Sequence, residues 1–230
     1  MAGRKTVELE VYLDLLSQPC RAIYIFLNCN KIPHKVKTVA IRKGENRTPE
    51  YTKLNPMQKV PVMVDNDFVL TESDAILKYL ATKYDVPGNW YPRHPERRAR
   101  VDEYTAWHHT NTRPHAAKVF LMEVLLPHMT GQPADPLKVE RALADLNDTL
   151  DKLENMFLKR QPFLCGDDIS LADLLAMCEL MQPLGGGRDI LKDCPKLLSW
   201  KSRVQSALGD SFDKAHTVLY SLRDRSKAKL

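Results

Sequence analysis

The chain begins with a strict alternation of apolar and polar residues. In "VELEVYLD", residues 7–14, the apolar side chains fall on one face of an extended chain and the glutamates fall on the other. This pattern predicts a half-buried strand. The period then becomes helical, because Ile23, Phe26 and Leu27 fall on one face of a helix. Pro19 suits the first turn of that helix, and Asn30 marks its end. The first two elements are therefore a strand and a helix.

The following residues continue as a small α/β unit. "KVKTVAI" (35–41) predicts a second strand, "RKGENRTPEYTKLNP" (42–56) a polar loop, and "VPVMV" with "FVL" two short strands around a turn at 65–67. "TESDAILKYLATKY" (71–84) predicts a helix in which Thr71 and Asp74 have the spacing of a capping box. The order β-α-β-loop-β-β-α is a compact α/β arrangement.

The pattern changes at "PGNWYP", where proline and glycine interrupt the periodicity and no later segment alternates as a strand. Apolar residues spaced by three and four predict a helix along 139–157. In "ISLADLLAMCELM", Ser170 and Asp173 form a predicted capping box at the start of another helix. We therefore predict two domains, an α/β domain over residues 7–87 and an all-helical domain over residues 93–230.

Composition adds little to this picture. The formal charge of +5 admits an anionic partner, but the densest basic cluster, "RHPERRAR", lacks interleaved aromatic residues and is interpreted as a solvated helix face. We expect no nucleic-acid partner. No window is apolar enough to span a bilayer, and the first residues contain no apolar stretch typical of a signal peptide. We expect no membrane association.

The five cysteines are odd in number and widely spaced, which predicts free thiols in a reducing compartment, the cytoplasm. The last three residues, Ala-Lys-Leu, differ at one position from the peroxisomal Ser-Lys-Leu signal, so peroxisomal targeting is a minority hypothesis. His108 and His109 are adjacent, a spacing that suits neither a helical metal pair nor a zinc finger, and we expect no metal.

The junction between the first strand and helix carries candidate chemistry. A Cys-x-x-Cys pair there would indicate thiol-disulfide exchange, but "SQPC" places Ser17 where the first cysteine would stand. Ser17 cannot form a disulfide, so a reactive sulfur at a thioredoxin-like corner would have to come from elsewhere. Judged locally, Ser17 is an ordinary helix N-cap and Cys20 a small buried residue.

Four separated segments, "LSQPCRA", "KVPVM", "LTESDAILKYL" and "DISLADL", together resemble the cytosolic glutathione S-transferases. "YLDLLSQPCRAIYIF", "VDEYTAWHH" and "FLCGDDISLADLLA" resemble the theta class in particular, and the resemblance spans about residues 7 to 222. It implies a thioredoxin-like domain, a helical domain with an electrophile pocket, and a homodimer. It also implies glutathione as co-substrate, conjugated to small hydrophobic electrophiles such as alkyl halides and epoxides, with possible reduction of organic hydroperoxides.

The same resemblance implies roles for individual residues. Ser17 would donate a hydrogen bond to the glutathione thiolate. Val60 would pair its main chain with the cysteinyl part of glutathione beside a cis Pro61, and Glu72 and Ser73 would hold the γ-glutamyl end. The alternatives are that Ser17 only caps its helix and that Pro61 is trans on an edge strand.

Other positions are less like the family pattern. Lys59 would reach a carboxylate or simply be solvated. Asn46 stands where theta enzymes often have a histidine that contacts the glycyl carboxylate, and Arg47 beside it would supply charge. Arg113 matches an arginine that points at the active site in some relatives, or is a surface residue. The chain lacks the longer C-terminal segment of some members, which predicts a more open electrophile pocket.

Two other functions remain open from the residues. The protein could be a non-catalytic glutathione S-transferase-like module that binds ligands or serves assembly, or Cys20 could act as the thiol of a glutathione-dependent thiol transferase.

Overall fold

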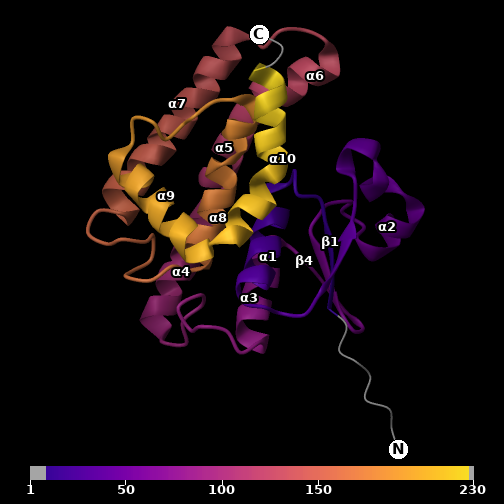
Figure 1. Ribbon diagram of the computed structural model, residues 1–230, viewed down its shortest axis with the longest axis vertical. Helices are drawn as coiled ribbons and strands as arrows, with labels where there is room; N and C mark the ends of the chain where they lie inside the picture. Colours follow the sequence, from indigo (N-terminus) through magenta and orange to yellow (C-terminus); the bar gives the residue numbers. More distant parts are fainter. Residues whose placement is uncertain (1–8, 228–230) are drawn as a thin grey trace, which may run out of the picture. The chain divides into compact units, whose positions relative to one another are not determined.

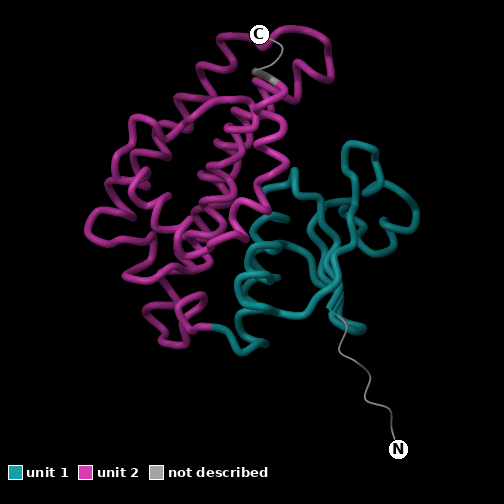
Figure 2. Tube along the Cα trace, in the orientation of Figure 1, with its two compact units in different colours: residues 1–86 teal, residues 87–230 magenta. Residues whose placement is uncertain are grey.

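A computed structural model describes residues 9–227, and the chain divides after Val86 into two compact units (Figure 2). The Ala-Lys-Leu tail on which the peroxisomal hypothesis depends lies outside the described residues.

The first unit contains a four-stranded sheet in the order β2-β1-β3-β4. Strand β1 pairs with β2 in parallel, while β3 pairs antiparallel with both β1 and β4. The strands are β1 (Leu9–Leu13), β2 (Lys35–Thr38), β3 (Val62–Asp65) and β4 (Phe68–Thr71). The helices are α1 (Gln18–Cys29), α2 (Pro49–Leu54) and α3 (Ser73–Lys83), with 3-10 turns η1 (Ile41–Lys43) and η2 (Glu45–Arg47).

Helices cover both faces of this sheet, with α1 and α3 on one side and α2 on the other (Figure 1). Val11 on β1 is fully buried, whereas Tyr12 points to the opposite face, where its ring meets Tyr51 of α2 edge-on at 6.3 Å between centroids. Tyr51 also lies in an apolar cluster with Val39 and Val62. The thioredoxin-like α/β fold predicted for this part of the chain is confirmed.

Two details differ from the sequence expectation. The polar segment 42–56 is not only a loop, because Thr48 caps α2 by accepting a hydrogen bond from the Tyr51 N–H and Pro49 begins the helix. Thr71 is not a helix cap, because it belongs to β4 and pairs with Val62. The N-cap of α3 is instead Glu72, and its side chain makes no capping hydrogen bond.

Every named element of the second unit is helical. The α-helices are α4 (Pro95–His108), α5 (Thr112–Phe120), α6 (Leu126–Thr130), α7 (Pro136–Lys152), α8 (Leu171–Leu180), α9 (Pro195–Leu208) and α10 (Asp210–Lys227). Shorter turns are the π-helical η3 (Leu121–Leu125) and η4 (Leu153–Phe157) and the 3-10 turn η5 (Gln182–Gly186). The helical prediction is confirmed. None of the helices described between residues 9 and 227 has the length and apolarity to cross a membrane.

Helix α8 is the core of this unit, since all ten of its residues are buried. Its predicted capping box is present, and Asp173 does more than cap. The carboxylate accepts from the backbone N–H and hydroxyl of Ser170, from the Leu164 N–H and from the Trp200 indole N–H, at 2.8–3.0 Å. Asp173 therefore ties the start of α8 to the preceding loop and to α9.

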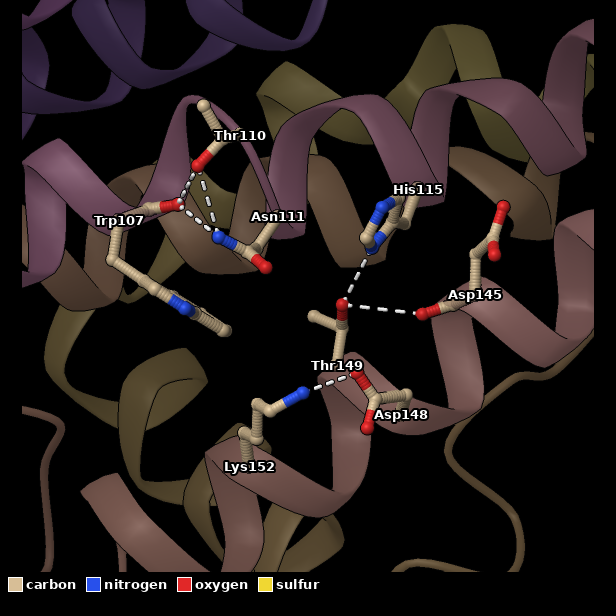
Figure 3. A network of polar contacts seen from close by, with 8 residues as sticks. All are labelled: Trp107, Thr110, Asn111, His115, Asp145, Asp148, Thr149 and Lys152. Atoms are coloured by element: carbon tan, nitrogen blue, oxygen red, sulfur yellow. Dashed lines mark hydrogen bonds and ion pairs between the residues drawn. The ribbon is translucent and has the colours of Figure 1, made fainter.

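A network of polar side chains joins α5 to α7 (Figure 3). His115 Nδ1 lies 2.7 Å from the hydroxyl of the buried Thr149, which also donates to the Asp145 carbonyl of its own helix. Nearby, the Asn111 side chain donates to the Trp107 carbonyl at the end of α4. The His115 contact satisfies the buried hydroxyl of Thr149 between two helices, and we assign both contacts a structural role.

Candidate active site

The pairing register brings most of the predicted site residues to one end of the sheet. Tyr12 near the end of β1 pairs with Val62 at the start of β3, and Val62 pairs with Thr71 at the end of β4. Ser17, the Val60–Pro61 peptide and the Glu72–Ser73 pair lie just beyond those strand ends. The 3-10 turn η1 reaches the same end, because its Ile41 N–H donates to Asp14 Oδ2 at 3.0 Å, and the turn η2, which contains Asn46, follows it along the chain.

The turn before α1 is held by two residues that the sequence pattern did not single out. Asp14 accepts from the Leu16 N–H through Oδ1, at 2.9 Å. Arg21 is fully buried, and its Nη1 donates to the carbonyls of Leu15 and Leu16 at 3.0 and 3.1 Å. A buried arginine inside an apolar helix stripe is unusual, and this is the only signal by which the sequence could have indicated it.

Ser17 is the N-cap residue of α1 by position, but its side chain makes no capping hydrogen bond. The alternative that it simply caps the helix through its hydroxyl is therefore wrong. The Ser17 hydroxyl lies close enough to the thiol of Cys20, three residues later, to act toward lowering the pKa of that thiol. Burial is the largest influence on that thiol and raises the pKa of Cys20 to about 12, so Cys20 is a neutral S–H near pH 7.

The Val60–Pro61 peptide bond is cis, as the family resemblance implied. Val60 precedes β3, and its side chain packs against the Tyr51 cluster on the α2 side of the sheet. Among the residues that the structure describes, no main-chain hydrogen bond involves Val60. Its N–H and C=O are thus available to an extended ligand.

Glu72 has φ +65° and ψ +115°, a conformation that non-glycine residues adopt at a cost of about 1–3 kcal/mol. It directly precedes α3, an 11-residue helix whose first residue, Ser73, is buried. The Glu72 side chain is exposed. The strained backbone of Glu72 thus keeps its carboxylate exposed while the next residue, Ser73, places a buried hydroxyl at the N-terminus of α3. Helix N-termini favour anions.

Of the three remaining predicted residues of this unit, two are exposed and one is turned inward. Arg47 and Lys59 are exposed. The side chain of Asn46 turns inward, and its Nδ2 donates to the Gln58 carbonyl at 2.7 Å.

Arg113 lies in the first turn of α5, in the second unit, with its side chain 34% exposed. Its Nε is 3.9 Å from Oε1 of Glu179, a buried residue of α8. His108 Nε2 lies 4.0 Å from the same oxygen, but burial first, then His109 and Arg113, lower the pKa of His108 to about 3. His108 is thus neutral, and the charge opposite Glu179 is that of Arg113.

All five cysteines are free thiols, as predicted. Within residues 9–227 no three histidine, cysteine or acidic side chains are grouped as metal ligands would be.

Comparison with known proteins shows the family to which both units belong. Residues 17–83 match the family model "Glutathione S-transferase, N-terminal domain", and residues 116–207 match "Glutathione S-transferase, C-terminal domain". Both units therefore correspond to the domains of one enzyme family.

Individual relatives specify the class. Glutathione S-transferase theta-1 of Bos taurus is 48% identical over 221 residues, covering 96% of this chain and 92% of that protein. Human glutathione S-transferase T1-1 in its apo form is 47% identical with a TM-score of 0.91, covering 94% of this chain and 91% of the other. A human theta-class enzyme, solved with the glutathione conjugate of 1-menaphthyl sulfate, is 40% identical with a TM-score of 0.91. The match covers 96% of this chain and 91% of that enzyme. The chain belongs to the theta-class glutathione S-transferases.

Proposed function

We propose that the protein is a glutathione transferase that binds glutathione at the end of the sheet where β1, β3 and β4 meet. It conjugates the glutathione thiolate to small electrophiles such as alkyl halides and epoxides, and it reduces organic hydroperoxides as a secondary activity. The observation that carries this proposal is the convergence of Ser17, Val60 and Ser73 at one sheet end, which follows from the strand register.

Glutathione is an extended peptide, and the main chain of Val60 would pair with its cysteinyl part as an added strand does. The γ-glutamyl carboxylate would bind the Ser73 hydroxyl and N–H at the start of α3, and the α-amino group would approach the exposed Glu72. Arg47 and Lys59 would supply positive charge for the glycyl carboxylate.

Ser17 would stabilise the thiolate. A free thiol has a pKa near 8.5, and each unit by which it is lowered requires about 1.4 kcal/mol of preferential interaction with the thiolate. A hydroxyl donor to a charged acceptor contributes about 1.5–3 kcal/mol. Cys20 stays protonated, so no thiolate of the protein itself competes with the glutathione sulfur for the hydrogen of the Ser17 hydroxyl.

Arg113 would contribute a positive charge to the electrophile pocket of the helical unit, with Glu179 Oε1 at 3.9 Å from its Nε. The family relationship further supports a homodimer, and the five free thiols suit a reducing compartment such as the cytoplasm.

The alternatives carry less support. A thiol transferase that uses Cys20 needs an accessible thiolate, whereas this thiol is fully buried and has a pKa of about 12. A non-catalytic module is less well supported because the Ser17 hydroxyl is not used to cap its helix and is therefore available for a catalytic role.

The proposal is tested by initial rates of glutathione conjugation with a panel of alkyl halides and epoxides. Wild type, Ser17→Ala and Cys20→Ala are compared, with glutathione affinity measured for each. Turnover should be lost only in Ser17→Ala, with binding retained. A wild type that binds glutathione but conjugates nothing would indicate a carrier, and loss of turnover only in Cys20→Ala would indicate thiol transfer.

A further inference from the structure

The backbone just before Val60 is held in place by side-chain donors. Tyr51 OH and Asn55 Nδ2 both donate to the Lys59 carbonyl, at 2.7 and 2.8 Å, and Asn46 Nδ2 donates to the Gln58 carbonyl at 2.7 Å. The consecutive carbonyls of Gln58 and Lys59 are thus held by side-chain hydrogen bonds and not by pairing with a neighbouring strand. The segment needs this support because Gln58 has φ +55°, in the left-handed region that costs a non-glycine residue energy.

These donors come from two different parts of the fold. Tyr51 belongs to α2 and Asn55 is the C-cap of that helix, so both are local to the segment they hold. Asn46 belongs to the separate 3-10 turn η2, twelve residues before Gln58. Its hydrogen bond therefore closes a loop of the chain and fixes the turn against the segment that leads into Val60.

The amide group of Asn46 is oriented for this contact. One hydrogen of its Nδ2 is directed to the Gln58 carbonyl, and its Oδ1 is buried and has no hydrogen-bond partner among residues 9–227. A buried amide oxygen repels a carboxylate and leaves the group poorly suited to bind one. The exposed cations Arg47 and Lys59 are better candidates for the glycyl carboxylate.

We infer that Asn46 is a positioning residue, which fixes the Gln58 carbonyl and through it the Lys59–Val60 peptide, rather than a ligand of the glycyl carboxylate. This inference rests on the proposed function. It changes the role that the family resemblance implied for this position, because a positioning residue affects the cysteinyl contact of any ligand, with or without a glycine.

γ-Glutamylcysteine separates the two roles because it keeps the cysteinyl and γ-glutamyl parts of glutathione and lacks the glycine. Dissociation constants for both ligands are measured by calorimetry on the full chain for wild type, Asn46→Ala and the neighbouring control Arg47→Ala. Loss of one neutral hydrogen bond should weaken binding roughly three- to tenfold.

In Asn46→Ala we expect both ligands to weaken by the same factor, with the KM for glutathione raised and kcat at saturating glutathione near that of wild type. In Arg47→Ala we expect glutathione alone to weaken. A loss confined to glutathione in Asn46→Ala, or no loss for either ligand, would overturn the inference.

Asn46→Gln keeps an amide N–H donor at this position and provides a second test if Asn46→Ala does not fold. The ratio of the two dissociation constants should equal that of wild type. A selective gain for glutathione would place residue 46 at the glycyl carboxylate and overturn the inference while leaving the proposed function intact. Failure of wild type to bind either ligand would overturn the proposed function, and the inference with it.

Discussion

Replacing Asp173 with alanine should destabilise the helical unit strongly. The side chain is fully buried and accepts from Leu164 N–H, Ser170 N–H, the Ser170 hydroxyl and the Trp200 indole. Alanine would leave three buried N–H donors without an acceptor, each costing about 1–3 kcal/mol before water or small shifts compensate. We expect a loss of about 3–5 kcal/mol in the free energy of unfolding, which is among the largest effects of a single substitution.

The assay is urea unfolding followed by tryptophan fluorescence. The three tryptophans, at positions 90, 107 and 200, all lie in the second unit, so the signal reports on that unit alone. With a slope of about 2 kcal/mol per molar urea, the midpoint should fall by roughly 2 M. Asp168→Ala is the matched control, because that side chain is 65% exposed and its one ion pair is 3.9 Å long, and its midpoint should barely move. A loss below about 1 kcal/mol in Asp173→Ala would refute the reasoning that its hydrogen bonds hold α8 in place.

Two further predictions concern the same unit. His108 has a pKa of about 3 when folded and an ordinary value near 6.5 when unfolded, so the unfolded state binds more protons between these values and stability falls as pH drops below about 6.5. Protonation of this group should lower the free energy of unfolding by about 2 kcal/mol between pH 7 and pH 5. Urea titrations at the two pH values test this, and a His108→Gln variant that lost as much stability as wild type would contradict it. Gly186→Ala would place a Cβ 2.6 Å from Val124 Cγ2 and should cost about 1–3 kcal/mol by thermal unfolding. Gly88→Ala, where a Cβ meets nothing within 4 Å, should leave the melting temperature unchanged, and equal effects of the two substitutions would show that the close contact is relieved without cost.

Much of the fold was predictable where a local pattern agrees with the tertiary structure. The alternation along 9–13 became β1, and the Ser170–Asp173 box became the start of α8. The box proposed for Thr71 and Asp74 was wrong although its spacing is the same. Thr71 completes the β4 ladder and Glu72 turns the chain with a positive φ, so a tertiary constraint replaced the local one.

Helix α2 was missed because its six residues are too few to show an apolar period, although Thr48 followed by Pro49 was a usable signal for a helix start. The prediction of one buried apolar face along residues 139–157 was also only partly correct. Ala142 and Thr149 are buried while Leu143 is only half-buried, because the face of α7 that meets its neighbours is rotated from the most apolar one.

Motifs indicated the residues that we propose to bind glutathione, but not the residues that hold them in position. Tyr51 and Asn55 act on the Lys59 carbonyl through contacts that no spacing rule encodes. Burial is the main cause that raises the pKa of the Tyr51 hydroxyl, which keeps it a proton donor. Such supporting residues depend on how α2 packs against the sheet, which a single sequence does not specify.

The central claim is that the Ser17 hydroxyl stabilises the thiolate of bound glutathione. The most direct measurement is the ultraviolet absorbance of the thiolate, titrated against pH with glutathione bound to wild type and to Ser17→Ala. We predict that wild type lowers the pKa of the bound thiol by about one to two units relative to free glutathione, and that Ser17→Ala returns it close to the free value while still binding glutathione. An equally lowered pKa in both proteins would contradict the account and assign thiolate stabilisation to another group.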